Sequence, residues 1–164
     1  MTINWTVYTD GACRPNPGYG GYAVIIENEG LEQPLILSGS KRVATNQEME
    51  LLAIVDALHT ITTLVDPDAD YLDNVVTVIS DNEWAIKCLN GQYKRCTKYP
   101  TWRNTAKKYM ERFVVHFEHI YSHQKVETHA QAMNQLCDSL AKQAAEAVQE
   151  DGIEKGWWTK KGKL

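Results

Sequence analysis

The stretch VYTDGACRPNPGYGGYAVII, from Val7 to Ile26, determines how the chain begins to fold. Its first apolar residues are typical of a strand, and a Gly/Pro-rich turn around Asn16 separates them from a second apolar run. We therefore expect a hairpin whose first strand leads into Asp10. Aspartate often caps a turn, so Asp10 could be a structural residue, or it could be a carboxylate held at a strand end to bind a ligand.

The composition is that of an ordinary soluble domain, with 164 residues of which 43% are hydrophobic and 23% charged. This length supports one domain with a sizeable core. No apolar run approaches the roughly 20 residues of a membrane span, and the first residues show no secretory signal. We expect a cytoplasmic monomer with no membrane partner. The net charge of −4 excludes a uniformly positive surface but allows a local basic patch.

The four cysteines form no CxxC pair and match no zinc-site spacing. We therefore expect four reduced thiols, as in a cytosolic compartment. They are Cys13, Cys88, Cys96 and Cys137.

The remaining elements alternate between strand and helix patterns. Strands are expected over residues 5–12, 21–27, 34–41, 75–80 and 114–122, and helices after Thr45 and over residues 81–91, 101–113 and 134–149. The acidic segment VDPDADYLDN lacks the glycine and final Glu of a calcium-binding EF-hand loop, which favours a solvated loop. Three antiparallel strands followed by helix-linked parallel strands predict one mixed sheet in an α/β domain. We expect a catalytic domain over residues 1–150 and a basic, Trp-containing tail over residues 151–164.

Four carboxylates lie near the ends or starts of these elements, where the fold can bring them together. Asp10 and Asp81 each follow an apolar strand, and they lie side by side if the first and fourth strands are neighbours. Glu50 on the first long helix and Asp138 on the last can point to the same place. Crowded carboxylates need a cation to stay ionised, and hard oxygen ligands favour magnesium or manganese. Two such ions about 3.5–4 Å apart would form a phosphodiester-cleaving site.

Four short motifs occur in order on these elements: YTDGACRPNPGYGGYA, TNQEMELLA, VISDNEW and NQLCDSLAKQAA. Together they resemble the sequential motifs of type 1 ribonuclease H over roughly residues 5–148. The resemblance implies a ribonuclease H-like fold, with a five-stranded mixed sheet flanked by helices. It also implies an endoribonuclease that hydrolyses the RNA strand of RNA–DNA hybrids with two magnesium ions, for which manganese can substitute. The products would carry 5′-phosphate and 3′-hydroxyl ends.

The resemblance also implies roles for individual residues. Asp10 would bridge the two ions, Glu50 and Asp81 would complete one metal site, and Asp138 would serve the other. Three polar residues match positions that contact nucleic acid, and their side chains suit minor-groove and 2′-hydroxyl recognition. They are Asn16, Asn46 and Gln47.

Other residues near these motifs are assigned by position. Two histidines, His123 and His129, lie in a long loop where the family has one functional histidine, and we favour His123 because it ends the strand. His119 is expected to be an ordinary strand residue. Glu48 is interpreted as the capping-box partner of Thr45.

Two further positions have alternatives that stay open. Glu83 is a carboxylate where relatives carry an uncharged residue, so it would turn away from the phosphate or help to hold metal. Cys13 either matches a residue of the family's first loop or is a small packing residue.

The sequence departs from larger bacterial members, because the basic, Trp-rich protrusion is shortened or missing and no N-terminal hybrid-binding module is expected. Six basic residues either form a modest patch that faces phosphate or lie on a solvated helix face. They are Lys94, Arg95, Lys98, Arg103, Lys107 and Lys108. The tail can contact substrate or be a disordered end; it carries Trp157, Trp158, Lys160, Lys161 and Lys163. The rival functions are a nuclease of the same fold acting on double-stranded RNA or recombination intermediates, and a non-catalytic nucleic-acid-binding relative.

Overall fold

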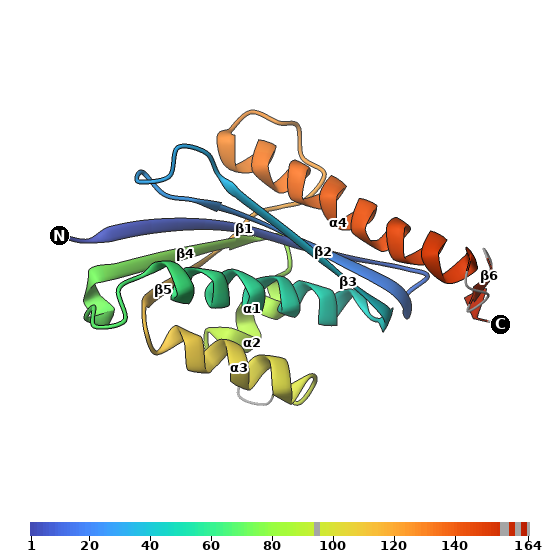
Figure 1. Cartoon of the computed structure of the whole chain (residues 1–164), viewed down its shortest axis with the longest axis horizontal. Coiled ribbons are helices and arrows are strands. Elements are labelled where there is room, and N and C mark those ends of the chain that lie inside the picture. Colours follow the sequence, from blue (N-terminus) through green and yellow to red (C-terminus); the bar gives the residue numbers. More distant parts are fainter. Residues whose placement is uncertain (94–95, 155–157, 160–161, 164) are drawn as a thin grey trace.

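The computed structural model describes residues 1–93, 96–154, 158–159 and 162–163. Its main feature is a five-stranded sheet in the order β3-β2-β1-β4-β5 (Figure 1). The strands are β1 (Ile3–Arg14), β2 (Gly18–Glu27), β3 (Leu35–Ala44), β4 (Asn74–Ser80) and β5 (Val114–His119). The α-helices are α1 (Asn46–Leu64), α2 (Glu83–Leu89), α3 (Pro100–Met110) and α4 (His129–Glu154), and a short 3-10 helix, η1, spans Tyr71–Asp73.

The pairing of the strands confirms the predicted mixed sheet. β1, β2 and β3 are antiparallel, whereas β4 and β5 run parallel to β1. The register of β1 against β4 ends with Thr9 opposite Ser80, so Asp10 and Asp81 follow at the same level. β1 itself continues to Arg14, paired with β2. Asp10 therefore does not cap a turn. It lies just beyond the level at which β4, the other strand that pairs with β1, ends.

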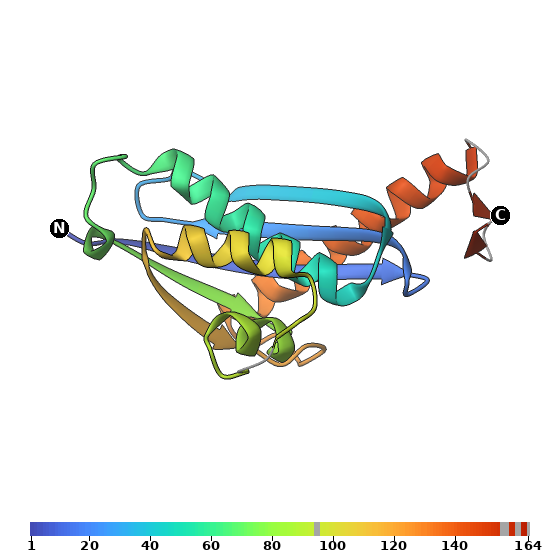
Figure 2. The ribbon, with the colours of Figure 1, turned by 90° about the horizontal axis from the view of Figure 1, so that it is seen from below.

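Helices cover both faces of the sheet, and the strands alternate between them. Figure 2 shows α1 and α3 across the same face, with α4 behind the sheet. Val7 of β1 packs in the larger core under α1, together with Val24 and Val76. The next residue, Tyr8, packs with Ile25 in the smaller core near α4. This period of two is that of a strand buried on both sides.

Two glycines let the helices approach the sheet closely. A Cβ added at Gly11 would lie 2.5 Å from the backbone nitrogen of Glu50 on α1. A Cβ at Gly21 would lie 2.3 Å from the backbone nitrogen of Ala145 on α4. Only glycine fits at such distances. Gly21, the first residue of the strand expected over residues 21–27, therefore lies inside β2, where it allows close packing of α4.

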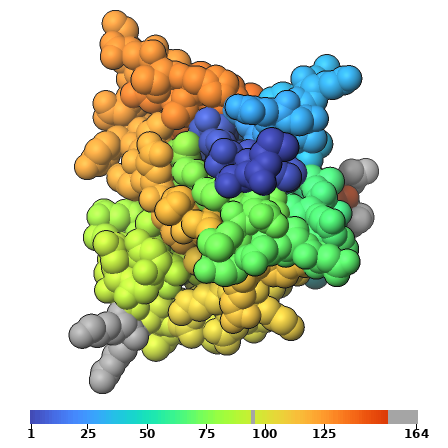
Figure 3. Space-filling model, turned by 90° about the vertical axis from the view of Figure 1, so that its left-hand side faces the viewer, coloured from blue at the N-terminus to red at the C-terminus, as the bar shows by residue number. Residues whose placement is uncertain are grey.

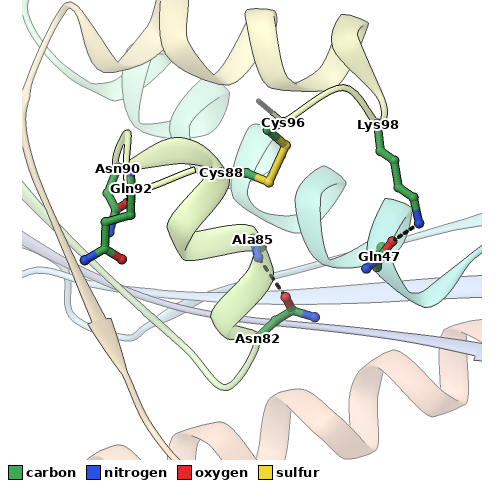
Figure 4. The surroundings of a disulfide bond; sticks show 8 residues. All are labelled: Gln47, Asn82, Ala85, Cys88, Asn90, Gln92, Cys96 and Lys98. Carbon is green, nitrogen blue, oxygen red and sulfur yellow. Dashed lines mark hydrogen bonds between the residues drawn. A yellow bond between two sulfur atoms is a disulfide. The ribbon is translucent and has the colours of Figure 1, made fainter. Parts of the chain in front are cut away.

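A disulfide joins Cys88 at the end of α2 to Cys96, with the two Cα atoms 5.5 Å apart (Figure 4). The expectation of four reduced thiols is thus wrong for this pair, because the chain after α2 folds back on the helix that it has just left. Cys13 and Cys137 are free and buried.

The two ends of the chain lie at opposite ends of the molecule (Figure 1). The start of β1 lies beside the loop between α1 and β4 (Figure 3), where a cavity is lined by Met1, Ile3 and Val65 among others. At the other end, α4 continues past residue 150 to Glu154, and β6 (Trp158–Thr159) pairs with β7 (Gly162–Lys163). Within the described ranges, no helix combines the length and apolar composition that crossing a bilayer requires. Predictions that rest on Lys94, Arg95, Trp157, Lys160 and Lys161 fall outside the described residues.

Candidate active site

Three carboxylates meet at the point where β4 ends beside β1. Asp10, Glu50 and Asp81 each offer one oxygen, and these oxygens all lie within 4.8 Å of one another. Asp10 comes from β1, Asp81 follows β4, and Glu50 comes from the first turns of α1. The parallel register aligns the two aspartates, and Gly11 allows α1 to bring Glu50 against them. The structure thus brings together three of the four predicted metal ligands.

Burial makes this cluster costly in its ionised form. Asp10 is 3% exposed and Glu50 is 5% exposed. Burial, with added repulsion from Asp81, raises the pKa of Asp10 to about 7, although the backbone N–H of Gly11 donates to its Oδ1 over 2.8 Å. Burial and the nearby charge of Asp10 raise the pKa of Glu50 well above its usual range. The cluster therefore disfavours negative charge unless a cation is present.

The donor set of the cluster fits a divalent cation. Oδ2 of Asp10 and Oε2 of Glu50 are buried, and the described part of the chain offers them no donor apart from a proton shared between these two carboxyl groups. Buried polar atoms normally have partners, so two orphaned carboxylate oxygens facing one cluster require an explanation. Carboxylate oxygens without sulfur ligands are what magnesium and manganese prefer. We take these orphaned oxygens as support for a metal site.

Asp81 is contacted by two residues that the sequence did not identify, Asn134 and His119. Burial raises the pKa of Asp81, and a hydrogen bond with Asn134 of α4 opposes that rise. His119, at the end of β5, contacts the backbone carbonyl of Asp81 through Nε2 at 3.2 Å. Asn134 opens the motif NQLCDSLAKQAA, so its position in the motif was the available signal. His119 had no comparable signal, because its contact depends on the pairing of β5 with β4.

Asp138 lies beside the cluster and outside the trio. It lines a small polar pocket together with Asp81 and His123. Its Oδ2 accepts a hydrogen bond from Nζ of Lys142, one turn later on α4, at 2.8 Å. This ion pair partly neutralises the carboxylate in the absence of metal. Asp138 is therefore at the edge of the site, where a second ion could lie.

The two candidate histidines have different surroundings. His123 lines the pocket that contains Asp81 and Asp138, and its backbone is left-handed, with φ of 56°. His129 instead lies 2.8 Å from a carboxylate oxygen of Glu27, with its ring edge-on to Tyr8. This placement agrees with the choice of His123, whose catalytic role stays a prediction.

The three predicted substrate-binding residues lie around the first turn of α1. Asn16, in the β1–β2 turn, accepts a hydrogen bond through Oδ1 from the backbone N–H of Asn46 at 3.2 Å. The next residue, Gln47, accepts through Oε1 from Nζ of Lys98 at 3.1 Å (Figure 4). We call Asn16, Asn46 and Gln47 the amide row. Both asparagines are exposed and Gln47 is half-buried, so the row faces solvent.

Two glutamates next to the site have partners of their own. Glu48 donates its backbone N–H to Oγ1 of Thr45, as predicted, but its side chain binds elsewhere. It accepts from Nζ of Lys41 at 2.8 Å and from the indole of Trp102 at 3.0 Å, so the reciprocal half of the capping box is not formed. Glu83 is exposed and forms an ion pair with Lys87 at 2.7 Å, turning toward its own helix.

Comparison with known proteins agrees with this geometry. A family model described as RNase H matches residues 3–146 of the chain. The chain belongs to the RNase H family. The Ribonuclease H of Chromohalobacter salexigens is 33% identical over 153 residues, covering 88% of this chain and 85% of that relative. The chain is thus an RNase H enzyme, as the four motifs predicted.

Solved RNase H structures resemble the fold. The N-terminal RNase H domain of a Mycobacterium tuberculosis protein superposes with a TM-score of 0.74 at 19% identity, covering 92% of this chain and 99% of that one. LC11-RNase H1, solved in complex with an RNA/DNA hybrid, has a TM-score of 0.67 at 26% identity, covering 88% of this chain and 99% of that one. The predicted RNase H fold is therefore confirmed.

Proposed function

We propose that this RNase H hydrolyses the RNA strand of RNA–DNA hybrids with two divalent ions, magnesium in the first instance, leaving 5′-phosphate and 3′-hydroxyl ends. One observation carries the proposal: Asp10, Glu50 and Asp81 converge beside the solvent-facing amide row, and the buried Asp10 and Glu50 each present an orphaned oxygen. A cation site next to groups that suit a minor groove is what strand-specific hydrolysis of a hybrid needs. The hybrid-bound LC11-RNase H1, which is similar to this chain, supports the choice of substrate.

The carboxylates divide into an inner and an outer set. Asp10, Glu50 and Asp81 would hold one ion, and Asp138, with Asp10, would hold the other. Divalent ions supply, when bound, the positive charge and Lewis acidity that phosphodiester hydrolysis requires. Asn134 and His119 keep Asp81 in place by contacting its side chain and its backbone carbonyl. These contacts support a fixed position for Asp81, while a metal ion would compete with Lys142 for Asp138.

The amide row would supply strand discrimination. Asparagine and glutamine side chains both donate and accept, which matches a 2′-hydroxyl and the base edges of a minor groove. The contact between Asn16 and the backbone of Asn46 fixes two members of the row relative to each other. His123 would assist turnover from its exposed loop, since an imidazole can exchange a proton near neutral pH and a loop can approach and withdraw.

A substrate panel tests this proposal. End-labelled RNA–DNA hybrid, double-stranded RNA and double-stranded DNA are each incubated with the enzyme in Mg²⁺, in Mn²⁺ and in chelator. We expect cleavage of the RNA strand of the hybrid alone, with both metals and not in chelator. Preferential cleavage of double-stranded RNA would favour the rival nuclease, and metal-dependent binding without cleavage would favour a non-catalytic relative. Gel filtration and cell fractionation test the expected monomer and cytoplasmic location.

A further inference from the structure

The segment between α2 and α3 lies against the substrate-facing end of α1. We call residues 90–99 the connector, of which 90–93 and 96–99 are described. Its described part has no helix or strand, and most of its residues are exposed. Gly91 has a positive φ of 84°, which lets the chain turn away from α2. The position of such a segment depends on the contacts of its few buried or half-buried residues, Cys96 and Tyr99.

Two consecutive connector residues make the contacts with α1. The hydroxyl of Tyr99 hydrogen-bonds Oγ1 of Thr45, the residue that caps α1. The ring of Tyr99 also packs edge-on against Trp84. Lys98 donates to the side chain of Gln47, a member of the amide row. The end of the connector therefore lies against the same turn of α1 that carries two of the three proposed substrate-binding residues.

Lys98 differs from other lysines of the protein in what it contacts. Lys41, Lys87, Lys125 and Lys142 each form an ion pair with a carboxylate. In the described part of the chain, the ammonium of Lys98 is held instead by the neutral amide of Gln47. Its positive charge is thus exposed and not neutralised by a neighbour. On a protein with a net charge of −4, such a charge beside the amide row suits a phosphate group of the substrate.

The disulfide holds the chain on the N-terminal side of this lysine, and Tyr99, which packs against the larger core, holds it on the C-terminal side. Cys88 is 1% exposed in the last turn of α2, and Cys96 is 9% exposed. Because Cys96 precedes Lys98 by only two residues, the bond fixes the connector to the helix immediately before the contacts with α1 (Figure 4). Without the bond, the described connector residues retain the two side-chain hydrogen bonds to α1 and the contacts of Tyr99 with Trp84 and the larger core. They also retain the backbone hydrogen bond from Tyr93 to the carbonyl of Lys87.

We propose that Cys88 and Cys96 are positioning residues for substrate binding: their disulfide holds Lys98 beside the amide row, where its ammonium contacts a phosphate of the hybrid. A dithiol can reverse this. Its two thiols give two electrons and two protons to the Cys88–Cys96 bond, which becomes two thiols while the dithiol becomes a disulfide. The oxidised enzyme then binds the hybrid more tightly than the reduced one. The proposal rests on the proposed function and adds a redox dependence to it.

Affinity and turnover should respond differently to reduction. The trio lies on β1, α1 and the end of β4, and none of these elements is joined by the disulfide, so kcat stays unchanged. Loss of one exposed ionic contact predicts a rise in KM of about threefold to fivefold. The slope of log affinity against log salt should fall by about 0.9, the value for one phosphate. A bond that only stabilised the fold would not change the salt slope.

The experiment compares the air-oxidised wild type, the same protein after reduction with dithiothreitol, and the double variant Cys88→Ser/Cys96→Ser. For each, kcat and KM on a labelled hybrid in Mg²⁺ are measured at several salt concentrations, with circular dichroism as a check of folding. Reduced wild type and double variant should share the higher KM and the smaller salt slope. The oxidised Lys98→Gln variant should have the same higher KM and smaller salt slope, and reduction should not change them further. Lys98→Arg should retain the redox response.

Several results would overturn the inference. An unchanged KM and salt slope after complete reduction, in an enzyme that still cleaves the hybrid, would refute it. A change confined to kcat would refute it as well. Unfolding of the reduced wild type at the assay temperature would also refute it, because the disulfide would then stabilise the fold as a whole. Failure of the oxidised wild type to cleave the hybrid at all would instead refute the proposed function.

Discussion

Replacing Asp10 by Asn should stabilise the metal-free protein while removing its activity. The side chain is 3% exposed and lies among Glu50 and Asp81, so its negative charge is both desolvated and repelled. The amide of Asn has the same shape without the charge, and its oxygen can still accept the N–H of Gly11. The substitution therefore removes the unfavourable charge and keeps the local hydrogen bond.

The size of this effect follows from the shifted pKa. The pKa of Asp10 rises from 3.8 to about 7 in the folded protein. Each unit corresponds to about 1.4 kcal/mol, so the ionised carboxylate costs at most on the order of 4 kcal/mol. An acid with a raised pKa holds its proton longer in the folded state, so the free energy of unfolding falls as pH rises from about 4 to about 7. Relaxation of the cluster reduces the effect, and we expect a gain of about 2–4 kcal/mol above pH 7.

Urea unfolding in chelator at pH 5 and pH 8 measures both parts of this prediction. The wild type should lose stability between the two values, and Asp10→Asn should lose less and be more stable at pH 8. Asp68→Asn is the matched control, since it removes one negative charge from an exposed loop. If the wild type is equally stable at both pH values, or if Asp10→Asn is less stable than wild type at pH 8, the carboxylate of Asp10 does not destabilise the folded state.

Two further predictions concern pairs of similar residues. His123→Ala should lower kcat on the hybrid with little change in KM, and His129→Ala should keep wild-type kcat; steady-state kinetics that show the reverse would assign the role to His129. Glu50→Gln should abolish cleavage, whereas Glu48→Gln should keep it and lower the free energy of unfolding by about 1 kcal/mol, since it weakens two polar contacts. Loss of cleavage in Glu48→Gln alone would show that the ligand on α1 is wrongly assigned.

The convergence of the carboxylates could be predicted because it depends on strand order and local register. Asp10 and Asp81 each follow an apolar strand, and pairing of those strands places them side by side. Glu50 follows from the motif on α1. Which alternative held for Asp10 could not be decided from its own segment, because turn caps and ligands share that residue type. The continuation of β1 to Arg14 excludes the turn cap, and the role of Asp10 as a ligand stays a prediction.

Contacts that depend on long-range packing could not be predicted. The pairing of Cys88 with Cys96 depends on how the connector turns after Gly91, which no periodic pattern reports. The contact of His119 with the carbonyl of Asp81 likewise depends on the register of β5. The spacing of Thr45 and Glu48 predicted a capping box, but the side chain of Glu48 accepts hydrogen bonds from Lys41 and Trp102 instead. In each case long-range packing decided what local sequence left open.

The most direct test of the central claim is the rate at which the RNA strand of an end-labelled hybrid is cleaved in Mg²⁺. Wild type, Asp81→Asn and the control Asp68→Asn are compared, with a chelator sample for each. We expect wild type and Asp68→Asn to cleave the RNA strand at equal rates, to leave the DNA strand intact and to stop in chelator, while Asp81→Asn loses nearly all activity. Wild-type rates from Asp81→Asn, or cleavage by the wild type in chelator, would contradict this expectation.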